Sequence, residues 1–295
     1  MIFNAPENKN NMMRTLLLVV FTTVVAFRSP AFTLSTIDAT NKFSYGANVG
    51  WMDWRGDIVN GVIIDEYVCR GSIYSANVGW ISLGNGSPLN SVQYKNVSAA
   101  DFGVNHDGLG NLRGFAYGAN IGWINFENIG APKVDLLTGK LSGYAWSANC
   151  GWISLSNAAA YVQTDSVQQG TPAPNGLPIA WLVSNFGSTN VSAVADADGD
   201  GVDNANEYLA GTDPNDSNSL LRITAITHGL LPNYTTMNWD AVPTRFYATQ
   251  ARSKLESGAW TDLIVWPIQG TASAAFGDTA TNQFYRVRAF RPLTP

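Results

Sequence analysis

The chain has 295 residues and a net charge of −5; 45% of its residues are hydrophobic, 12% aromatic and only 13% charged. Its length suits two or three domains, and its apolar content excludes global disorder. Sparse charge and 28 glycines favour sheets and turns over charged helix faces, so the chain is expected to be mostly β. No basic patch of the kind that binds nucleic acid is present, so no nucleic-acid partner is expected.

Residues 1–31 predict a signal peptide. Arg14 is followed by an apolar run over residues 15–27, and the small residues Ser29 and Ala31 suit cleavage by signal peptidase. The run is short for a bilayer-spanning helix, and a retained membrane anchor is the alternative. We therefore expect a secreted or cell-surface protein with no membrane span after cleavage.

Residues 32–164 contain four copies of one short pattern, at 44–54, 73–86, 116–128 and 145–157. Each copy has the core Ala-Asn-x-Gly-Trp, and spacings of 29, 43 and 29 residues separate the tryptophans Trp51, Trp80, Trp123 and Trp152. Aromatic and small residues alternate before the Asn, as in a strand with one buried face, and Asn-x-Gly suits a tight turn. Each copy predicts a β-hairpin, and the region predicts one domain of two pseudo-equivalent halves.

The repeated tryptophans have two interpretations. Each follows the turn glycine directly, where it can cover its hairpin and fill the core, and this is the interpretation that we favour. The alternative is a surface on which indole faces stack against sugar rings. Trp54 is the better candidate for that role, because only the third copy, with Phe126, also has an aromatic residue at this position.

The repeats resemble the AWSxNxGWI-type segments of exported bacterial proteins, which implies a secreted or surface location. The same region holds both cysteines of the predicted mature chain, Cys69 and Cys150. In an oxidising compartment a disulfide between them is a candidate, and two buried thiols are the alternative.

Residues 165–178 are predicted to form a linker, because the stretch 168–176 is uncharged and rich in Gly and Pro. An apolar segment then begins at Ile179 and predicts one or two helical turns that end near Gly187.

Residues 179–219 are predicted to form a small calcium module with short helices. Alternating aspartates, a glycine at the sixth position and a glutamate at the twelfth satisfy the D-x-D-x-D-G-x5-E pattern of calcium loops. Alternate positions point carboxylates inward, and a carbonyl, an Asn-held water and the final glutamate complete a set of hard oxygen ligands. The predicted Ca²⁺ ligands are Asp196, Asp198, Asp200, Val202 through its carbonyl, Asn204 and Glu207.

This module resembles the bacterial thrombospondin type 3 repeat. The matching elements within residues 195–219 are Asp-x-Asp-x-Asp-Gly, Asn-x-x-Glu-Tyr and Gly-Thr-Asp-Pro. The resemblance implies a compact calcium-stabilised module of an extracellular protein, and it adds Asp213 as a supplementary ligand. Only one copy is present, so a long calcium-stiffened rod is not expected.

Residues 220–295 predict a β-sandwich. Six strand-like runs, separated by turn residues, lie at 221–226, 234–239, 246–251, 260–266, 273–276 and 284–290. The region resembles the small immunoglobulin- or fibronectin-like modules that follow such calcium repeats in exported bacterial proteins.

The sequence does not predict an enzyme. His106 and His228 are its only histidines, and neither has a flanking catalytic motif or zinc-ligand spacing. A polysaccharide-cleaving enzyme needs only two carboxylates. The candidates in the repeat domain are Asp53, Asp65, Glu66, Asp101 and Glu127, and surface carboxylates are the favoured interpretation.

The expected function is that of an exported, calcium-binding structural or adhesive protein of a bacterial cell surface or matrix. Exposed edges of a hairpin array can pair between chains, so self-assembly into a homopolymer or surface layer is one form of this hypothesis. Carbohydrate binding, with cell-surface glycans as partners of a lectin-like accessory protein, is the alternative, and a polysaccharide-cleaving enzyme is third.

Overall fold

The computed structural model describes residues 34–228, 234–253, 259–266, 269–277 and 284–294. The protein is mostly β, as predicted, with two short α-helices, α1 (Ile179–Phe186) and α2 (Asn204–Ala210), and one short 3-10 turn, η1 (Asn128–Gly130). The predicted signal peptide lies outside the described residues. Within the described part of the chain, no helix is both long enough and apolar enough to cross a membrane.

Each of the four repeats forms one antiparallel hairpin, which confirms the predicted strand–turn–strand unit. The eight strands are β1 (Ile37–Gly46), β2 (Gly50–Asp53), β5 (Ser72–Ser75), β6 (Gly79–Ser82), β8 (Leu112–Gly118), β9 (Gly122–Asn125), β12 (Tyr144–Ser147) and β13 (Gly151–Ser154).

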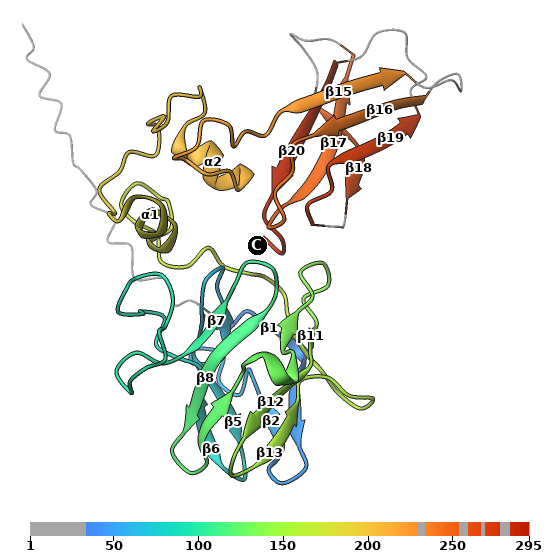
Figure 1. Cartoon of the computed structure of the whole chain (residues 1–295). Helices are drawn as coiled ribbons and strands as arrows, with labels where there is room; N and C mark the ends of the chain where they lie inside the picture. Colours follow the sequence, from blue (N-terminus) through green and yellow to red (C-terminus); the bar gives the residue numbers. More distant parts are fainter. Residues whose placement is uncertain (1–33, 229–233, 254–258, 267–268, 278–283, 295) are drawn as a thin grey trace, which may run out of the picture. The chain divides into compact units, whose positions relative to one another are not determined.

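The four hairpins close into an eight-stranded antiparallel barrel (Figure 1). Neighbouring hairpins pair in chain order, and the last strand returns to the first through Tyr45 opposite Ser154 and Gly46 opposite Ile153. The four turns gather at one end of the barrel. Closure leaves no free edge in this ring of strands, a consequence that the repeat pattern alone did not predict.

Short strands extend or flank the barrel. β14 (Val162–Thr164) pairs with β1, and β7 (Val104–His106) pairs with β8. The apolar stretches upstream of the second and fourth repeats form two small two-stranded sheets: β3 (Ile63–Ile64) with β4 (Cys69–Arg70), and β10 (Lys133–Val134) with β11 (Leu141–Ser142).

The barrel core is filled by the residues that lie one and three positions after each repeat tryptophan. All are 3% exposed or less: Met52, Ile81, Ile124 and Ile153, then Trp54, Leu83, Phe126 and Leu155. Burial of each such side chain contributes about 1.5–3 kcal/mol. Trp54 is 1% exposed, donates its indole N–H to Ser44 Oγ at 2.9 Å and meets the Phe126 ring edge-on at 6.3 Å.

This packing reverses the two predictions made for the tryptophans. The repeat tryptophans do not fill the core, because each is 44–47% exposed on the outer face of its hairpin. Trp54, the candidate under the alternative sugar-stacking interpretation, is instead a core residue. Successive residues of a strand point to opposite faces, so burying the Ile or Met after the tryptophan places the indole outside.

The asparagines of the four turns form a closed ring of hydrogen bonds. The side-chain amide of each one donates to a turn carbonyl of the preceding hairpin: Asn48 to Cys150, Asn77 to Val49, Asn120 to Val78 and Asn149 to Ile121, at 2.9–3.1 Å. The Ala-Asn-x-Gly motif therefore does more than permit a turn, because it links neighbouring turns around the end of the barrel.

The last three repeats have a glycine nine residues before the tryptophan, and the backbone explains why. Gly71, Gly114 and Gly143 have φ values of 83–98°. A Cβ atom at these positions would lie 2.3–2.4 Å from a backbone oxygen. Positive φ and this close approach together require glycine.

Cys69 and Cys150 are both buried free thiols of the barrel core. The candidate disulfide does not join them in this structure, and the arrangement is the one predicted as the alternative. Burial raises the pKa of the Cys69 thiol above its usual range, which keeps the group protonated and unreactive.

The C-terminal region forms two three-stranded antiparallel sheets, in the orders β15-β16-β19 and β18-β17-β20. The strands agree closely with the six predicted runs: β15 (Ile223–His228), β16 (Tyr234–Trp239), β17 (Phe246–Arg252), β18 (Thr261–Trp266), β19 (Ser273–Gly277) and β20 (Phe284–Phe290). Both sheets contribute to one core around Met237, Trp239 and Tyr247.

Candidate metal centre

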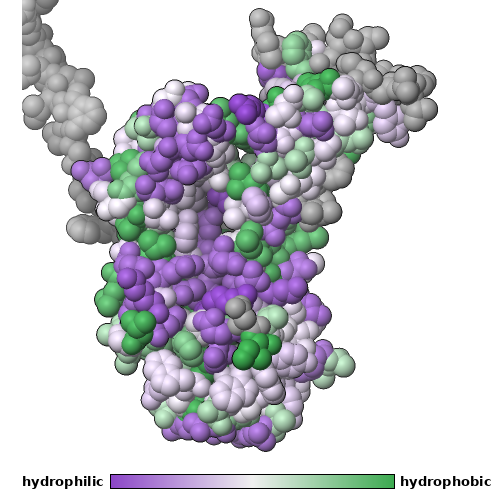
Figure 2. Space-filling view, in the orientation of Figure 1, coloured by the Kyte–Doolittle hydropathy of each residue, from purple (hydrophilic) through white to green (hydrophobic). Residues whose placement is uncertain are grey.

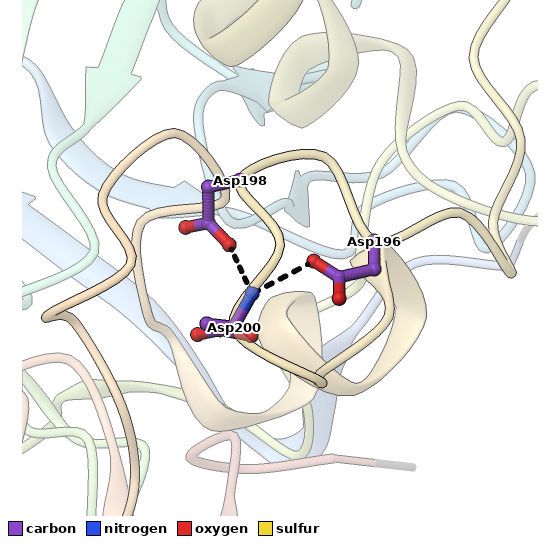
Figure 3. Close-up of side chains that lie close together, drawn as sticks. All are labelled: Asp196, Asp198 and Asp200. Atoms are coloured by element: carbon purple, nitrogen blue, oxygen red, sulfur yellow. Dashed lines mark hydrogen bonds between the residues drawn. The ribbon is translucent and has the colours of Figure 1, made fainter.

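The acidic loop that begins at Asp196 is shaped by its first carboxylate. Asp196 Oδ2 accepts a hydrogen bond from Gly201 N at 2.8 Å, and Oδ1 accepts from Gly199 N at 2.7 Å and Asp200 N at 3.2 Å. Asp198 Oδ1 also accepts from Asp200 N at 3.2 Å (Figure 3). Gly201 has φ +94°, a conformation that lets the chain turn sharply at the sixth position of the loop.

Three of the predicted ligands lie together. Asp196, Asp198 and Asp200 each place a carboxylate oxygen within 4.8 Å of the other two, so the cluster could hold a metal ion. Figure 3 shows Asp196 and Asp198 on either side of the Asp200 backbone. Three neighbouring aspartates alone do not define a metal site. The neighbouring helix adds buried oxygen atoms that have no hydrogen-bond partner.

Helix α2 brings two more predicted ligands to the loop in a buried position. Asp203 caps the helix by accepting from Asn206 N, and Asn204 and Glu207 on the first turns are 0% exposed. Asn204 Oδ1 and Glu207 Oε2 are buried and have no hydrogen-bond partner. The same is true of Asp198 Oδ2 and Asp200 Oδ2. Buried oxygens of this kind are costly unless a cation or water satisfies them.

The charges of the loop act on one another. Burial, then the nearby charges of Asp198 and Asp200, raises the pKa of Glu207 to about 7. Burial together with the charges of Asp200 and Asp196 also raises the pKa of Asp198. The pKa of Asp196 is lowered, chiefly by the hydrogen bond from Gly201 N. A divalent cation would offset the repulsion between carboxylates that helps to raise the pKa values of Glu207 and Asp198.

The residues present fit calcium. All the unsatisfied atoms are carboxylate or amide oxygens, the hard donors that Ca²⁺ takes in sets of about six to eight. No nitrogen or sulfur donor belongs to the described cluster, as zinc would favour. The residues that would hold the ion are Asp196, Asp198, Asp200, Asn204 and Glu207, with the Val202 carbonyl as the remaining predicted donor.

Asp213 is placed differently from the other predicted ligands. It is exposed, its carboxylate accepts from Asn215 N at 3.0 Å, and its own N–H donates to Ser219 Oγ at 2.9 Å. The structure does not group it with the three loop aspartates. Its carboxylate shapes its own turn.

The helix that carries Glu207 also makes a buried ionic network. Tyr208 donates its hydroxyl proton to Glu66 Oε2 at 2.8 Å, and Arg245 Nη2 donates to the Tyr208 carbonyl at 2.6 Å. Arg245 and Arg291 form ion pairs with Glu66 at 3.3 and 3.4 Å. Glu207 and Tyr208 are adjacent in the sequence, so helix α2 contributes to both the acidic loop and this network.

The other carboxylates considered for catalysis each have a structural partner. Asp53 pairs with Lys42 at 2.7 Å, and Asp65 pairs with Arg70 at 2.8 Å. The remaining acids are held by the network above or by backbone N–H groups: Glu66, Asp101 and Glu127.

The exterior of the barrel carries a feature that the sequence reasoning missed. Tyr45–Trp51, Tyr74–Trp80 and Tyr117–Trp123 form cross-strand pairs with ring centroids 4.8–4.9 Å apart. Trp146 lies opposite Trp152 in the fourth hairpin. All eight residues are 37–47% exposed. We call these four pairs the aromatic girdle.

Small polar residues separate the pairs of the girdle. The residue two positions after each repeat tryptophan is polar and lies opposite the first member of the next girdle pair: Asp53 opposite Tyr74, Ser82 opposite Tyr117, Asn125 opposite Trp146 and Ser154 opposite Tyr45. In the face shown in Figure 2, the lower end of the barrel is mostly pale, as expected for aromatic and small residues of intermediate hydropathy. The recurring polar residue was the signal that could have identified the outer face.

The chain matches none of the protein-family models, curated proteins or solved structures with which it was compared. The resemblance of the acidic loop to thrombospondin type 3 repeats therefore rests on the motif residues alone.

Proposed function

We propose that this chain is an exported, calcium-binding structural or adhesive protein. The proposal is carried by one observation: the carboxylate of Glu207 is fully buried, has an oxygen without a partner, and lies close enough to the three loop aspartates for their charges to raise its pKa. The tight cluster itself consists of Asp196, Asp198 and Asp200. A bound calcium ion would supply a shared positive charge to these oxygens. The chain's own residues would position them, with α2 presenting Asn204 and Glu207 to the loop.

Calcium would act as a structural ion. Extracellular calcium modules typically bind with dissociation constants of about 10⁻⁴–10⁻³ M. An ion that binds only the folded state stabilises it by about 2.7 kcal/mol at 100 times the dissociation constant. The loop would therefore hold its shape outside the cell and loosen where calcium is scarce.

Thermal unfolding in calcium and in a chelator tests this proposal. Calcium should raise the melting temperature of the wild-type protein by several degrees and leave that of Asp198→Asn nearly unchanged. Asp216→Asn is the matched control, because Asp216 is an exposed aspartate in a neighbouring turn whose carboxylate accepts from Asn218 N. An equal calcium response in wild type and Asp198→Asn would overturn the assignment.

A structural or adhesive protein needs a binding partner, and one candidate is a second copy of this chain. The closed ring of eight barrel strands offers no edge for pairing between chains, so self-assembly through strands would use the short flanking strands or the C-terminal sheets. We propose that those sheets form an immunoglobulin- or fibronectin-like sandwich, which is supported by their common core. Light scattering in calcium and in chelator tests assembly: particles that shrink on chelation support a calcium-dependent polymer, and a monomer in both opposes it.

Carbohydrate recognition is the second candidate function, and the aromatic girdle favours it. Four equivalent aromatic pairs are exposed on a rigid closed barrel, with small polar residues between them. Flat exposed rings beside hydrogen-bonding groups suit ligands that have an apolar face and polar edges. Binding to cell-surface glycans would make the protein lectin-like and would agree with an adhesive role. A glycan array probed with the full chain tests this candidate, and an absence of binding across the array would oppose it.

A further inference from the structure

One part of the aromatic girdle differs from the rest. Beside the third hairpin the surface has a hollow of about 430 Å³. Its walls come from that hairpin and from the long connection between β6 and β7. The lining residues are Asn96, Val97, Ser98, Ala99, Phe102, Phe115 and Trp123.

Three aromatic rings build the wall of the hollow. The Phe102 ring meets Trp123 edge-on at 5.1 Å and Tyr117 at 6.2 Å, and the Phe115 ring meets Trp123 at 6.3 Å. The Tyr117 ring also contacts Trp123, at 4.8 Å, and Trp123 nevertheless remains 44% exposed. The indole is therefore held by neighbouring rings while part of its surface stays accessible beside the hollow.

The connection that supplies the other wall is held rigidly although it forms no strand. Tyr94 is 4% exposed, and its hydroxyl accepts from Gly86 N at 2.6 Å. Asp101 is 4% exposed and accepts from Leu89 N and Lys95 N, both at 3.1 Å. Asn96 Oδ1 accepts from Gly103 N at 3.0 Å, which fixes the polar rim. Such preorganisation lowers the entropy that a ligand must lose on binding.

The chemistry of the lining defines the ligand. None of the seven lining residues carries a charge, so a charged ligand would find no counter-ion there. The polar side chains are those of Asn96 and Ser98, at the edge of an otherwise apolar wall. The Ser98 hydroxyl has no hydrogen-bond partner among the described residues. The site therefore suits a neutral ring with one apolar face and hydroxyl groups along its edge.

We propose that this hollow binds a neutral pyranose unit of a glycan, stacked on the Trp123 indole. The proposal rests on the carbohydrate-recognition candidate above and assigns its principal binding site. The second hairpin lacks this construction: it has Ser72 where the third has Phe115, and within the described residues Trp80 has a ring contact with Tyr74 alone. Trp80 is as exposed as Trp123, so exposure does not distinguish the two sites.

The test is a binding titration of the full chain with neutral oligosaccharides: cellohexaose, laminarihexaose, xylohexaose and mannohexaose. Calorimetry and tryptophan fluorescence give the affinity for each. Trp123→Ala and Phe102→Ala should weaken binding of the recognised sugar by about tenfold or more, because each removes part of the central aromatic wall. Trp80→Ala, at the same position of the second hairpin, separates the hollow from the rest of the girdle and should change the affinity by less than about twofold. Tyr234→Ala is the control outside the girdle, because Tyr234 is an exposed aromatic residue of the C-terminal sheets. Circular dichroism checks that each variant is folded.

The outcomes separate this site from the broader function. If Trp80→Ala and Trp123→Ala weaken binding equally, the whole girdle binds sugar and the assignment to the hollow is overturned. If none of the four oligosaccharides binds, the proposed site fails, while binding to other glycans on an array would leave the carbohydrate-recognition candidate standing. Selective loss in Trp123→Ala and Phe102→Ala supports the site.

Discussion

The barrel turns and the acidic loop are both tight turns built from small and polar residues. They differ in whether their polar side-chain atoms have hydrogen-bond partners. In the barrel, each turn asparagine donates its amide to a carbonyl of the preceding hairpin at 2.9–3.1 Å. In the acidic loop, oxygens of Asp198, Asp200, Asn204 and Glu207 are buried without partners.

The difference shows which region depends on something outside the chain. A closed ring of internal hydrogen bonds needs no ligand to satisfy its polar atoms. Buried carboxylate oxygens without donors are costly unless a cation or water satisfies them, and the calcium ion that we propose would do so.

Trp54→Ala should destabilise the protein most. The side chain is 1% exposed, and its removal leaves a cavity next to Phe126 and an unpaired Ser44 hydroxyl. Loss of a buried aromatic residue typically costs about 3–5 kcal/mol. Chemical denaturation measures the change. A cost below about 1 kcal/mol would contradict the placement of Trp54 in the core.

Glu207→Gln should have opposite effects on the stability of the protein in chelator and in calcium. In chelator the variant should be more stable than wild type, because the substitution removes a buried negative charge beside Asp198 and Asp200. In calcium it should lose most of the stabilisation of about 2.7 kcal/mol expected near saturation. Thermal unfolding in both conditions measures this crossover. Equal destabilisation in both would show a purely packing role for Glu207.

His106 should make barrel stability fall as the pH is lowered. The ring is 1% exposed, its Nδ1 lies 3.2 Å from the Asp65 carbonyl oxygen, and burial lowers its pKa below the usual 6.5. The unfolded chain therefore binds a proton below about pH 6.5 that the folded barrel resists. The contribution of His106 to the free energy of unfolding should fall with pH there, by at most about 1.4 kcal/mol per pH unit. The raised pKa of Glu207 has the opposite effect in the same range, so the measurement is the difference between wild type and His106→Gln from about pH 5.5 to 7.5. Wild type should lose stability relative to the variant as the pH falls.

Asn120→Ala should cost about 1 kcal/mol, the usual net contribution of one hydrogen bond. Its amide donates to the Val78 carbonyl at 3.1 Å and joins two turns. Asn120→Asp keeps the size of the side chain and removes the donor, so it should be no better than Ala. Chemical denaturation of both variants measures the change in the free energy of unfolding. If either variant is as stable as wild type, the ring of asparagines does not stabilise the barrel.

Trp80→Ala should have the smallest effect on stability. The indole is 47% exposed and contacts the Tyr74 ring across the strand pair in a tilted arrangement. Such cross-strand pairs contribute about 0.2–1 kcal/mol. Comparing this loss of stability with that of Trp54→Ala tests directly whether Trp54 lies inside the barrel and Trp80 outside it. Similar costs for the two substitutions would mean that the girdle serves as a second core.

The sequence predicts the elements of this protein better than their assembly. The hairpins, the helix that ends at Gly187 and the six C-terminal strands follow from period-two alternation and turn residues. Closure of the barrel depends on pairing between β1 and β13, more than 100 residues apart, and local patterns contain no information on such pairs.

The orientation of the tryptophans could have been predicted. In Trp-Ile-Ser-Leu the serine shares a face with the tryptophan, and the Ile and Leu share the other. Every copy has a polar residue two positions after the tryptophan and an apolar one three positions after it. Indole size suggested burial, whereas the alternation of the whole strand indicated the outer face. For the acidic loop, the motif predicted the cluster of Asp196, Asp198 and Asp200, and only the structure showed that the Glu207 carboxylate is completely buried.

Calcium titration by isothermal calorimetry tests the central claim most directly. The full chain, freed of metal by chelator and dialysis, should bind one calcium ion with a dissociation constant of about 10⁻⁴–10⁻³ M, and Asp198→Asn should bind none in that range. Unchanged binding by Asp198→Asn, or no heat of binding by the wild-type chain, would contradict a calcium site in the acidic loop.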